Sequence, residues 1–280
     1  MRSELIPGTS IEVVRRRAAS PRLRMALLDL DGTLSLIRAG WQTVMADRMV
    51  ADLLALGTGE TEADLRGEMM EMIDRTTGEP TAHQMAAFAQ AVARRGGEPL
   101  PVEALMERYR RDLASVIDSR HTTLAARDPS GQHWLVPGAR GMLQGLQAHG
   151  IGMFLASGTD HDQVVLEAEL LGLTGFFQLG IAGAVPPPAV FTKDLLVERL
   201  IREGLYTGGE MLGIGDGPVE ISAVARAGGI AIGVASTELQ PGTLNVEKRQ
   251  RLIDAGAHLI VADLSEHEVL LAYLADQGHL

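Results

Sequence analysis

The stretch Met25-Ala-Leu-Leu-Asp-Leu-Asp-Gly-Thr33 decides the fold of this chain. Its apolar run, Met25–Leu30, stops at an Asp-Gly pair, which predicts a buried parallel strand that ends in a loop. The same pattern returns in Ile151–Ala156 and Glu210–Ile214, and each of these runs also ends at small and polar residues. The chain therefore contains at least three buried strands of one kind.

Helical periodicity lies between these strands. Apolar residues recur at three- and four-residue spacing over Asp162–Leu171, Lys193–Glu203 and Val219–Ala227. Two more apolar runs, Gly229–Val234 and His258–Val261, have the length and β-branching of strands. Strands that alternate with helices predict an α/β fold with a doubly wound, Rossmann-like parallel sheet.

One long segment breaks the alternation because it shows helical periods alone. These periods cover Trp41–Leu56, Glu62–Ile73, Thr81–Ala93 and Val102–Ile117. We expect a core domain made of residues 1–34 and 136–280, with an all-helical cap domain, residues 35–135, inserted into it. Residues 1–24 are expected to be an irregular lead-in to the first strand.

Composition excludes several classes of protein. The 280 residues carry a net charge of -11, which disfavours binding to nucleic acid or to anionic membranes. The chain has no cysteine, so it can form neither a disulfide framework nor a thiolate metal site. No apolar run is long enough to span a membrane, and no signal peptide is evident. We expect a cytoplasmic monomer or homodimer.

Polar residues close the predicted strands, and ligands of doubly wound sheets bind at that edge. Asp29 and Asp31 lie on the same side of the first strand as it leaves the sheet. Two neighbouring carboxylates can divide labour between nucleophilic attack and proton transfer. The alternative is an ordinary Asp-Gly turn, although a carboxylate at the apolar position of Asp29 is costly without a function.

Two further groups suit a phosphate. Ser157-Gly158-Thr159 offers a hydroxyl and open backbone N–H groups after a strand, although such residues also begin helices. Lys193 is one of only two lysines among 25 basic residues, so its use where arginine is the habit favours a functional ammonium over a surface one.

Acidic residues close another strand at Gly215-Asp216-Gly217-Pro218-Val219-Glu220. Asp216 and Glu220 lie one helical turn apart, and carboxylates beside a phosphate are the ligands that Mg²⁺ prefers. The alternative is a helix that begins with favourable acidic residues.

Together these four groups resemble the haloacid dehalogenase superfamily of phosphohydrolases. The resemblance implies that Asp29 is the nucleophile and a metal ligand, and that Asp31 is the acid/base and lends its carbonyl to the metal. It also implies that Asp216 and Glu220 bind Mg²⁺, although Glu220 stands where aspartate is usual. The residues that it implies for phosphate binding are Thr33, Ser157, Gly158 and Lys193.

The resemblance also separates branches by chemistry. Dehalogenases lack an acid at the position of Asp31, and phosphonate-cleaving relatives use a cap lysine, which residues 35–135 do not contain. The expected activity is Mg²⁺-dependent hydrolysis of a small phosphomonoester, such as a sugar or polyol phosphate, through an aspartyl-phosphate. The alternatives are a phosphomutase of a sugar phosphate and a catalytically silent binding or regulatory module.

Substrate selection is expected to lie in the cap. Arg38, Trp41 and His83 are candidate specificity residues, although Trp41 and His83 each have an ordinary packing or surface alternative. The basic run Lys248–Arg251 follows a long loop, and we expect it to be solvated or structural rather than a phosphate clamp.

Overall fold

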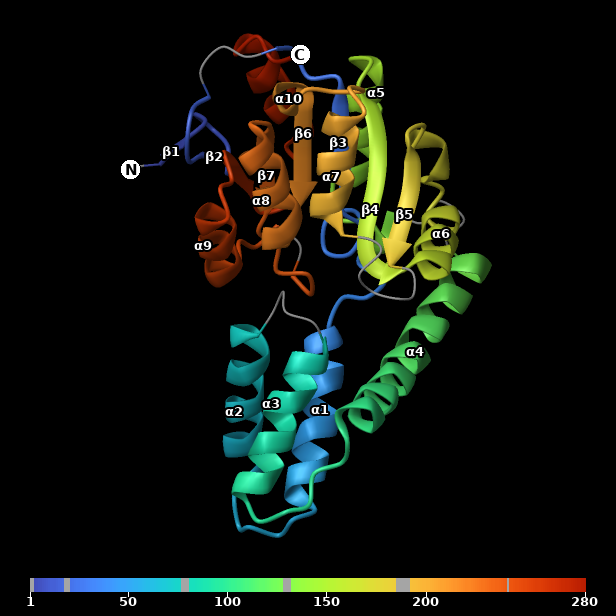
Figure 1. The fold of residues 1–280 in the computed structure, drawn as a ribbon, viewed down its shortest axis with the longest axis vertical. Coiled ribbons are helices and arrows are strands. Elements are labelled where there is room, and N and C mark those ends of the chain that lie inside the picture. Colours follow the sequence, from blue (N-terminus) through green and yellow to red (C-terminus); the bar gives the residue numbers. More distant parts are fainter. Residues whose placement is uncertain (1–2, 18–20, 77–80, 128–131, 185–191, 241) are drawn as a thin grey trace. The chain divides into compact units, whose positions relative to one another are not determined.

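The computed structural model describes residues 3–17, 21–76, 81–127, 132–184, 192–240 and 242–280. The chain divides into two compact units, Met1–Ala39 with Thr123–Leu280, and Gly40–Thr122. The first unit contains the sheet, and the second is helical (Figure 1).

The described residues of the first unit form an eight-stranded sheet in the order β1-β2-β8-β7-β6-β3-β4-β5. The strands are β1 Glu4–Leu5, β2 Glu12–Val13, β3 Met25–Leu28, β4 Gly152–Asp160, β5 Gly180–Ala184, β6 Met211–Gly215, β7 Ile230–Val234 and β8 Leu259–Val261. Strands β3 to β8 pair in parallel, whereas β1 and β2 are antiparallel. This sheet confirms the predicted doubly wound α/β fold.

Helices cover both faces of the sheet, so every residue of β3, β6, β7 and β8 is buried. These helices are α5 Ala139–Ala148, α6 His161–Leu170, α7 Lys193–Arg202, α8 Pro218–Ala227, α9 Val246–Asp254 and α10 His267–Asp276. Helices α7 and α8 pack against each other on one face, and α5 packs against α10 (Figure 1). Short 3-10 helices occur at Gln132–Trp134, Thr174–Phe176 and Gly208–Glu210.

The structure differs from the prediction in the lead-in, which is not wholly irregular. Ile11 and Val13 are buried, and β2 pairs with β8, because an otherwise open sheet edge gains hydrogen bonds from it. Strand β4 continues to Asp160 instead of ending at Ala156. Elements β5, α9 and α10 were not predicted.

The helical unit holds the four predicted helices: α1 Trp41–Leu54, α2 Glu62–Arg75, α3 Thr81–Arg94 and α4 Val102–Arg127. Helix α4 is longer than its periodicity predicted and continues past the end of this unit. The core of the helical unit is rich in methionine, which fills irregular gaps between helices. The buried residues of this core include Met45, Met49, Leu53, Leu65, Met69, Met72, Ile73, Met85 and Phe88.

The segments that lead into and out of the helical unit pair with each other within the first unit. Ser35 and Leu135 form an antiparallel bridge. The Leu36 N–H donates to the Trp134 carbonyl at 2.7 Å, and the Val136 N–H donates to the Leu34 carbonyl at 3.0 Å. No helix in the described part of the chain is both long and apolar enough to cross a membrane.

Candidate active site

Asp29 lies directly after β3, the strand between β4 and β6. Its N–H donates to the Ile214 carbonyl at 3.0 Å, so its backbone extends the pairing with β6. Only 6% of Asp29 is exposed. Asp29 is thus a buried carboxylate at the carboxyl end of β3, between β4 and β6.

A tight turn follows Asp29 and brings Asp31 back beside the sheet. The N–H groups of Leu34 and Ser35 both donate to the Leu30 carbonyl, at 2.9 and 2.8 Å. Gly32 has a φ of 72°, and a Cβ there would lie 2.2 Å from Asp216 Oδ2. The turn therefore needs glycine both for its backbone conformation and for the space that Asp216 occupies.

Lys193 begins α7 and reaches two carboxylates. Its Nζ donates to Asp29 Oδ1 at 2.5 Å and to Glu220 Oε2 at 2.8 Å. The Thr192 side chain caps α7 by accepting from the Leu195 N–H at 3.1 Å. Burial lowers the pKa of Lys193, but Asp29 and Glu220 more than offset this effect and leave the pKa above its ordinary value. Lys193 is therefore a buried, charged ammonium.

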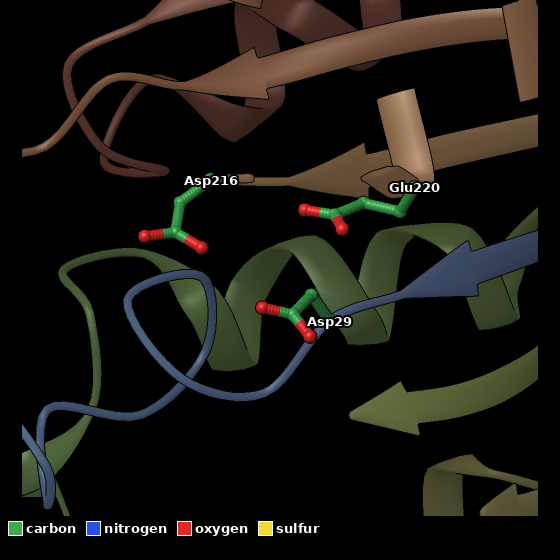
Figure 2. A group of neighbouring side chains, drawn as sticks. All are labelled: Asp29, Asp216 and Glu220. Carbon is green, nitrogen blue, oxygen red and sulfur yellow. The ribbon is translucent and has the colours of Figure 1, made fainter. Parts of the chain in front are cut away.

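Three carboxylates converge in the site: Asp29 follows β3, Asp216 follows β6, and Glu220 lies on α8 (Figure 2). One oxygen from each of Asp29, Asp216 and Glu220 lies within 4.8 Å of the others. Burial raises the pKa of Asp29 well above its ordinary value, Lys193 lowers it, and the neighbouring acidic groups raise it again. The donor set consists of hard oxygens with excess negative charge, which fits a divalent cation such as Mg²⁺.

Glu220 is already engaged on both carboxylate oxygens. Oε1 accepts from the Gly217 N–H at 2.7 Å, and Oε2 accepts from Lys193. Pro218 at the first position of α8 and the acidic Glu220 also suit a helix N-terminus. Among the described residues, Asp29 Oδ2 and Asp216 Oδ1 have no hydrogen-bond partner, so these two atoms are better placed than Glu220 to bind a cation directly.

Asp31 has a different environment from Asp29. Its Oδ2 accepts from the Thr159 hydroxyl at 2.9 Å and from the Ser157 hydroxyl at 3.3 Å. Its Oδ1 is buried without a hydrogen bond and lies 3.5 Å from Arg38 Nε. Burial raises the pKa of Asp31, although Arg38 and the Thr159 hydrogen bond lower it.

Arg38, a predicted specificity residue, lies in the first unit beside Asp31. Its guanidinium donates to Glu167 Oε1 at 2.7 Å. Glu167 is fully buried on α6, and burial raises its pKa to about 7 despite Arg38. The structure thus joins Arg38 to Asp31 and Glu167.

Of the two roles expected for the run that begins at Lys248, solvated or structural, the solvated one is wrong for Lys248. Lys248 is 6% exposed, and its Nζ donates to Asp216 Oδ2 at 2.8 Å and to Glu238 Oε1 at 3.4 Å. Lys248 lies in the first turn of α9, and from there its side chain reaches the acidic cluster. Arg249 has an ordinary structural role, since it forms an ion pair with Glu12 of β2.

The other predicted residues have these positions. Gly158 is exposed with open space beside it, and the Thr33 hydroxyl is buried with no hydrogen-bond partner among the described residues. Trp41 packs against the core of the helical unit. His83 is exposed in the first turn of α3.

The family model of haloacid dehalogenase-like hydrolases matches residues 23–228. The chain belongs to the haloacid dehalogenase-like hydrolase family. A comparison of this hydrolase with curated proteins finds no match.

Solved structures share the fold of the hydrolase. A predicted phosphoglycolate phosphatase from Haemophilus somnus 129PT is 14% identical, with a TM-score of 0.56 over 89% of this chain and 97% of that one. A candidate beta-phosphoglucomutase from Thermotoga maritima is 17% identical, with a TM-score of 0.57 over 90% and 100%. A HAD family hydrolase from Deinococcus radiodurans R1, with bound phosphate and sodium, is 22% identical, with a TM-score of 0.54 over 92% and 97%.

Three residues of the site escaped the sequence analysis: Glu167, Glu238 and Lys248. Glu167 had a detectable signal, because it lies three residues after Val164 on the face of α6 that is otherwise apolar. The scarcity of lysine, which favoured Lys193, applied equally to Lys248. Glu238 lies in a loop, where the spacing of residues in the sequence does not indicate the direction in which a side chain points.

Proposed function

We propose that this hydrolase removes phosphate from a small phosphomonoester, with Asp29 as the nucleophile and Asp31 as the acid/base. The observation that carries the proposal is the unequal environment of two carboxylates only two residues apart. Asp29 accepts from the ammonium of Lys193 beside two further carboxylates, whereas Asp31 accepts from the Thr159 and Ser157 hydroxyls and lies near Arg38. Two carboxyl groups with different partners can divide nucleophilic attack and proton transfer between them.

In the first half of the reaction, a carboxylate oxygen of Asp29 forms a bond to phosphorus. The bond from phosphorus to the ester oxygen breaks, and its electron pair leaves with that oxygen. Asp31 supplies the proton that the leaving oxygen takes up.

In the second half, Asp31 takes a proton from water as the water oxygen attacks phosphorus. The bond between Asp29 and phosphorus breaks, which releases phosphate and restores the carboxylate. Lys193 stays in contact with Asp29 and offsets negative charge that develops on the transferring group. One acid/base thus serves both halves.

We assign Mg²⁺ to Asp29 and Asp216, with the carbonyl of Asp31 as a further ligand and Glu220 acting mainly through Lys193. Bound there, the ion would offset phosphate charge and hold the phosphate for in-line attack. The fit depends on the acidic donor set around Asp29 rather than on any one contact.

The phosphate group itself is assigned to Thr33, Ser157, Gly158 and Lys193. Gly158 is exposed, so its backbone N–H is accessible to an anion. The Ser157 side chain already accepts from the Thr159 N–H at 3.0 Å, which fixes its hydroxyl near Asp31. A small polar cradle beside a buried ammonium suits a phosphoryl group better than a neutral ligand.

We further propose a sugar or polyol phosphate as the substrate, with residues 35–135 as a cap that selects it. The fold neighbours described as a phosphoglycolate phosphatase and a beta-phosphoglucomutase support a small phosphorylated metabolite. Trp41 and His83 stay predictions for substrate selection, and the second neighbour keeps a phosphomutase as an alternative.

A panel of phosphorylated metabolites with Mg²⁺ tests the function, with Asp29→Asn as the matched inactive variant. Release of free phosphate that depends on Asp29 supports a phosphatase. An isomeric phosphate formed with a bisphosphate activator indicates the phosphomutase instead. No turnover across the panel indicates a silent module and contradicts both. Asp31→Asn should slow unactivated esters most, since these need the leaving-group proton.

A further inference from the structure

The chain has two lysines among 25 basic residues, and both are buried at the same site. Lys193 contacts one pair of carboxylates. Lys248 contacts another pair, Asp216 and Glu238. Elsewhere the chain uses arginine for its cations, so a compact ammonium at both positions points to a common requirement.

The position of Lys248 within α9 is unfavourable for a positive charge. Asn245 caps this helix by accepting from the Lys248 N–H at 2.9 Å, which places Lys248 in the first turn. The N-terminus of a helix carries partial positive charge and repels cations. A solvated lysine would gain nothing there, so its carboxylate partners must hold it in place.

The loop before α9 is fixed to the turn after Asp29. The Ser236 hydroxyl donates to the Gly32 carbonyl at 3.2 Å, and the Asn245 N–H donates to the Ala235 carbonyl at 2.8 Å. Glu238 lies in this loop, and burial raises its pKa although Lys248 lowers it. These hydrogen bonds fix the loop and the start of α9, which carries Lys248, beside the turn after Asp29.

One oxygen of Asp216 has two close neighbours. Oδ2 occupies the space next to Gly32, where a Cβ would approach to 2.2 Å. The same oxygen accepts from Lys248 at 2.8 Å. Both contacts involve Oδ2, which leaves Oδ1 as the oxygen available to a cation.

Charge at the cluster agrees with this arrangement. Each ammonium touches two carboxyl groups, so the cluster holds four acidic groups against two ammonium groups. The acidic groups outnumber the ammonium groups, which suits a site that also binds a cation. These residues are Asp29, Glu220, Asp216 and Glu238, with Lys193 and Lys248.

We propose that Lys248 is a positioning residue that fixes the Asp216 carboxylate for Mg²⁺, and that Glu238 holds Lys248 in that role. The proposal rests on the metal-binding function proposed for the site. It assigns Lys248 no contact with substrate. Groups that orient a metal ligand typically change metal affinity by 10- to 100-fold when they are removed.

Charge and position predict opposite results for Lys248→Met. If Lys248 contributed charge alone, its loss would make the cluster more negative, and Mg²⁺ would bind more tightly. If Lys248 positions Asp216, its loss lets the carboxylate rotate, and Mg²⁺ binds more weakly. The sign of the change therefore separates the two roles.

The experiment measures Mg²⁺ binding alone, by titration calorimetry without substrate, at a temperature where each variant is folded. We expect Lys248→Met to weaken Mg²⁺ binding about 10- to 100-fold. The matched control is Arg249→Met on the same helix, which loses an ion pair with Glu12 and should bind Mg²⁺ as the parent does. If Lys248→Met does not fold, Lys248→Arg replaces it, since it conserves charge but not the position of the ammonium.

Unchanged or tighter binding in the Lys248 variant would overturn the proposal, and so would an equal loss in Arg249→Met or no Mg²⁺ binding by the parent. The metabolite panel tests the proposed hydrolysis separately. If the parent binds Mg²⁺ in a Lys248-dependent way but hydrolyses no ester, the positioning role of Lys248 is supported and the proposed phosphatase activity is contradicted. If the parent hydrolyses an ester but the Lys248 variant binds Mg²⁺ normally, the phosphatase activity is supported and the positioning role is contradicted.

Discussion

Replacement of Lys193 by arginine conserves charge and tests whether the site needs an ammonium. One nitrogen lies 2.5 Å from Asp29 Oδ1 and 2.8 Å from Glu220 Oε2, so a single atom bridges two carboxylates. The guanidinium is planar and wider, with its donors spread over three nitrogens. The Lys193 side chain is only 11% exposed, so the larger group cannot move out into solvent.

The expected cost follows from displacement rather than from lost charge. A shift of about 1 Å in a group that positions the reaction costs about 100-fold in rate, or about 2.7 kcal/mol of barrier. We therefore expect Lys193→Arg to lower kcat/KM by about 10- to 100-fold. The assay is hydrolysis of p-nitrophenyl phosphate at saturating Mg²⁺, with the melting temperature recorded in parallel.

Arg199→Lys is the matched control, because Arg199 lies on the same helix, with its side chain 65% exposed beside Glu203. Surface changes of this kind usually alter stability by about 0.5 kcal/mol or less. Lys248 cannot serve as the control, since it belongs to the same acidic cluster. Activity of Lys193→Arg within about twofold of the parent, well inside the expected displacement cost, would refute the reasoning.

Three further outcomes are expected. Gly32→Ala should lower the free energy of unfolding by about 1–2 kcal/mol, because Gly32 has a φ of 72°. The added Cβ would also displace Asp216 and weaken Mg²⁺ binding, so a normal Mg²⁺ affinity would contradict this expectation. Glu167→Gln should slow turnover without changing Mg²⁺ affinity, since Arg38 loses its charged partner; an unchanged rate would count against it. Burial and neighbouring cations lower the pKa of His258 to about 4 in the folded protein. As the pH falls, this histidine therefore takes up a proton at a higher pH in the unfolded chain than in the folded one. The free energy of unfolding should fall by about 1–2 kcal/mol between pH 6.5 and 4, measured by urea denaturation, and His258→Asn should lessen that fall.

Much of the fold follows from local patterns in the sequence. Uniformly apolar runs such as Met25–Leu28 identify strands buried on both faces, and the segments between Trp41 and Ile117 show helical periodicity alone. Strand β5, Gly180–Ala184, was missed because glycine and alanine give it little β character. The pairing of β2 with β8 joins residues far apart in the chain, which no local pattern reports.

The candidate site was predictable where function and strand ends coincide. Asp29, Asp31 and Asp216 follow strands whose neighbours in the sheet are fixed by the doubly wound topology, so their convergence follows from order alone. Lys248 and Glu238 come from a helix and a loop whose directions depend on tertiary contacts. The basic run of residues 248–251 therefore gave no indication that its first member is buried and the next forms a different ion pair.

The two carboxylates of the Asp29–Asp31 motif differ because the elements around them differ. Asp29 contacts an ammonium from α7, which lowers its pKa against the larger effect of burial, and we propose that Asp29 attacks phosphorus. Asp31 lies near a cation too, but Glu167 holds the guanidinium of Arg38 at 2.7 Å, whereas the closest approach of that group to Asp31 is 3.5 Å. A buried glutamate is costly unless it is paired, and here its pairing weakens the pull of Arg38 on Asp31. The environment of Asp31, and with it the acid/base role proposed for this residue, thus depends in part on Glu167 of α6.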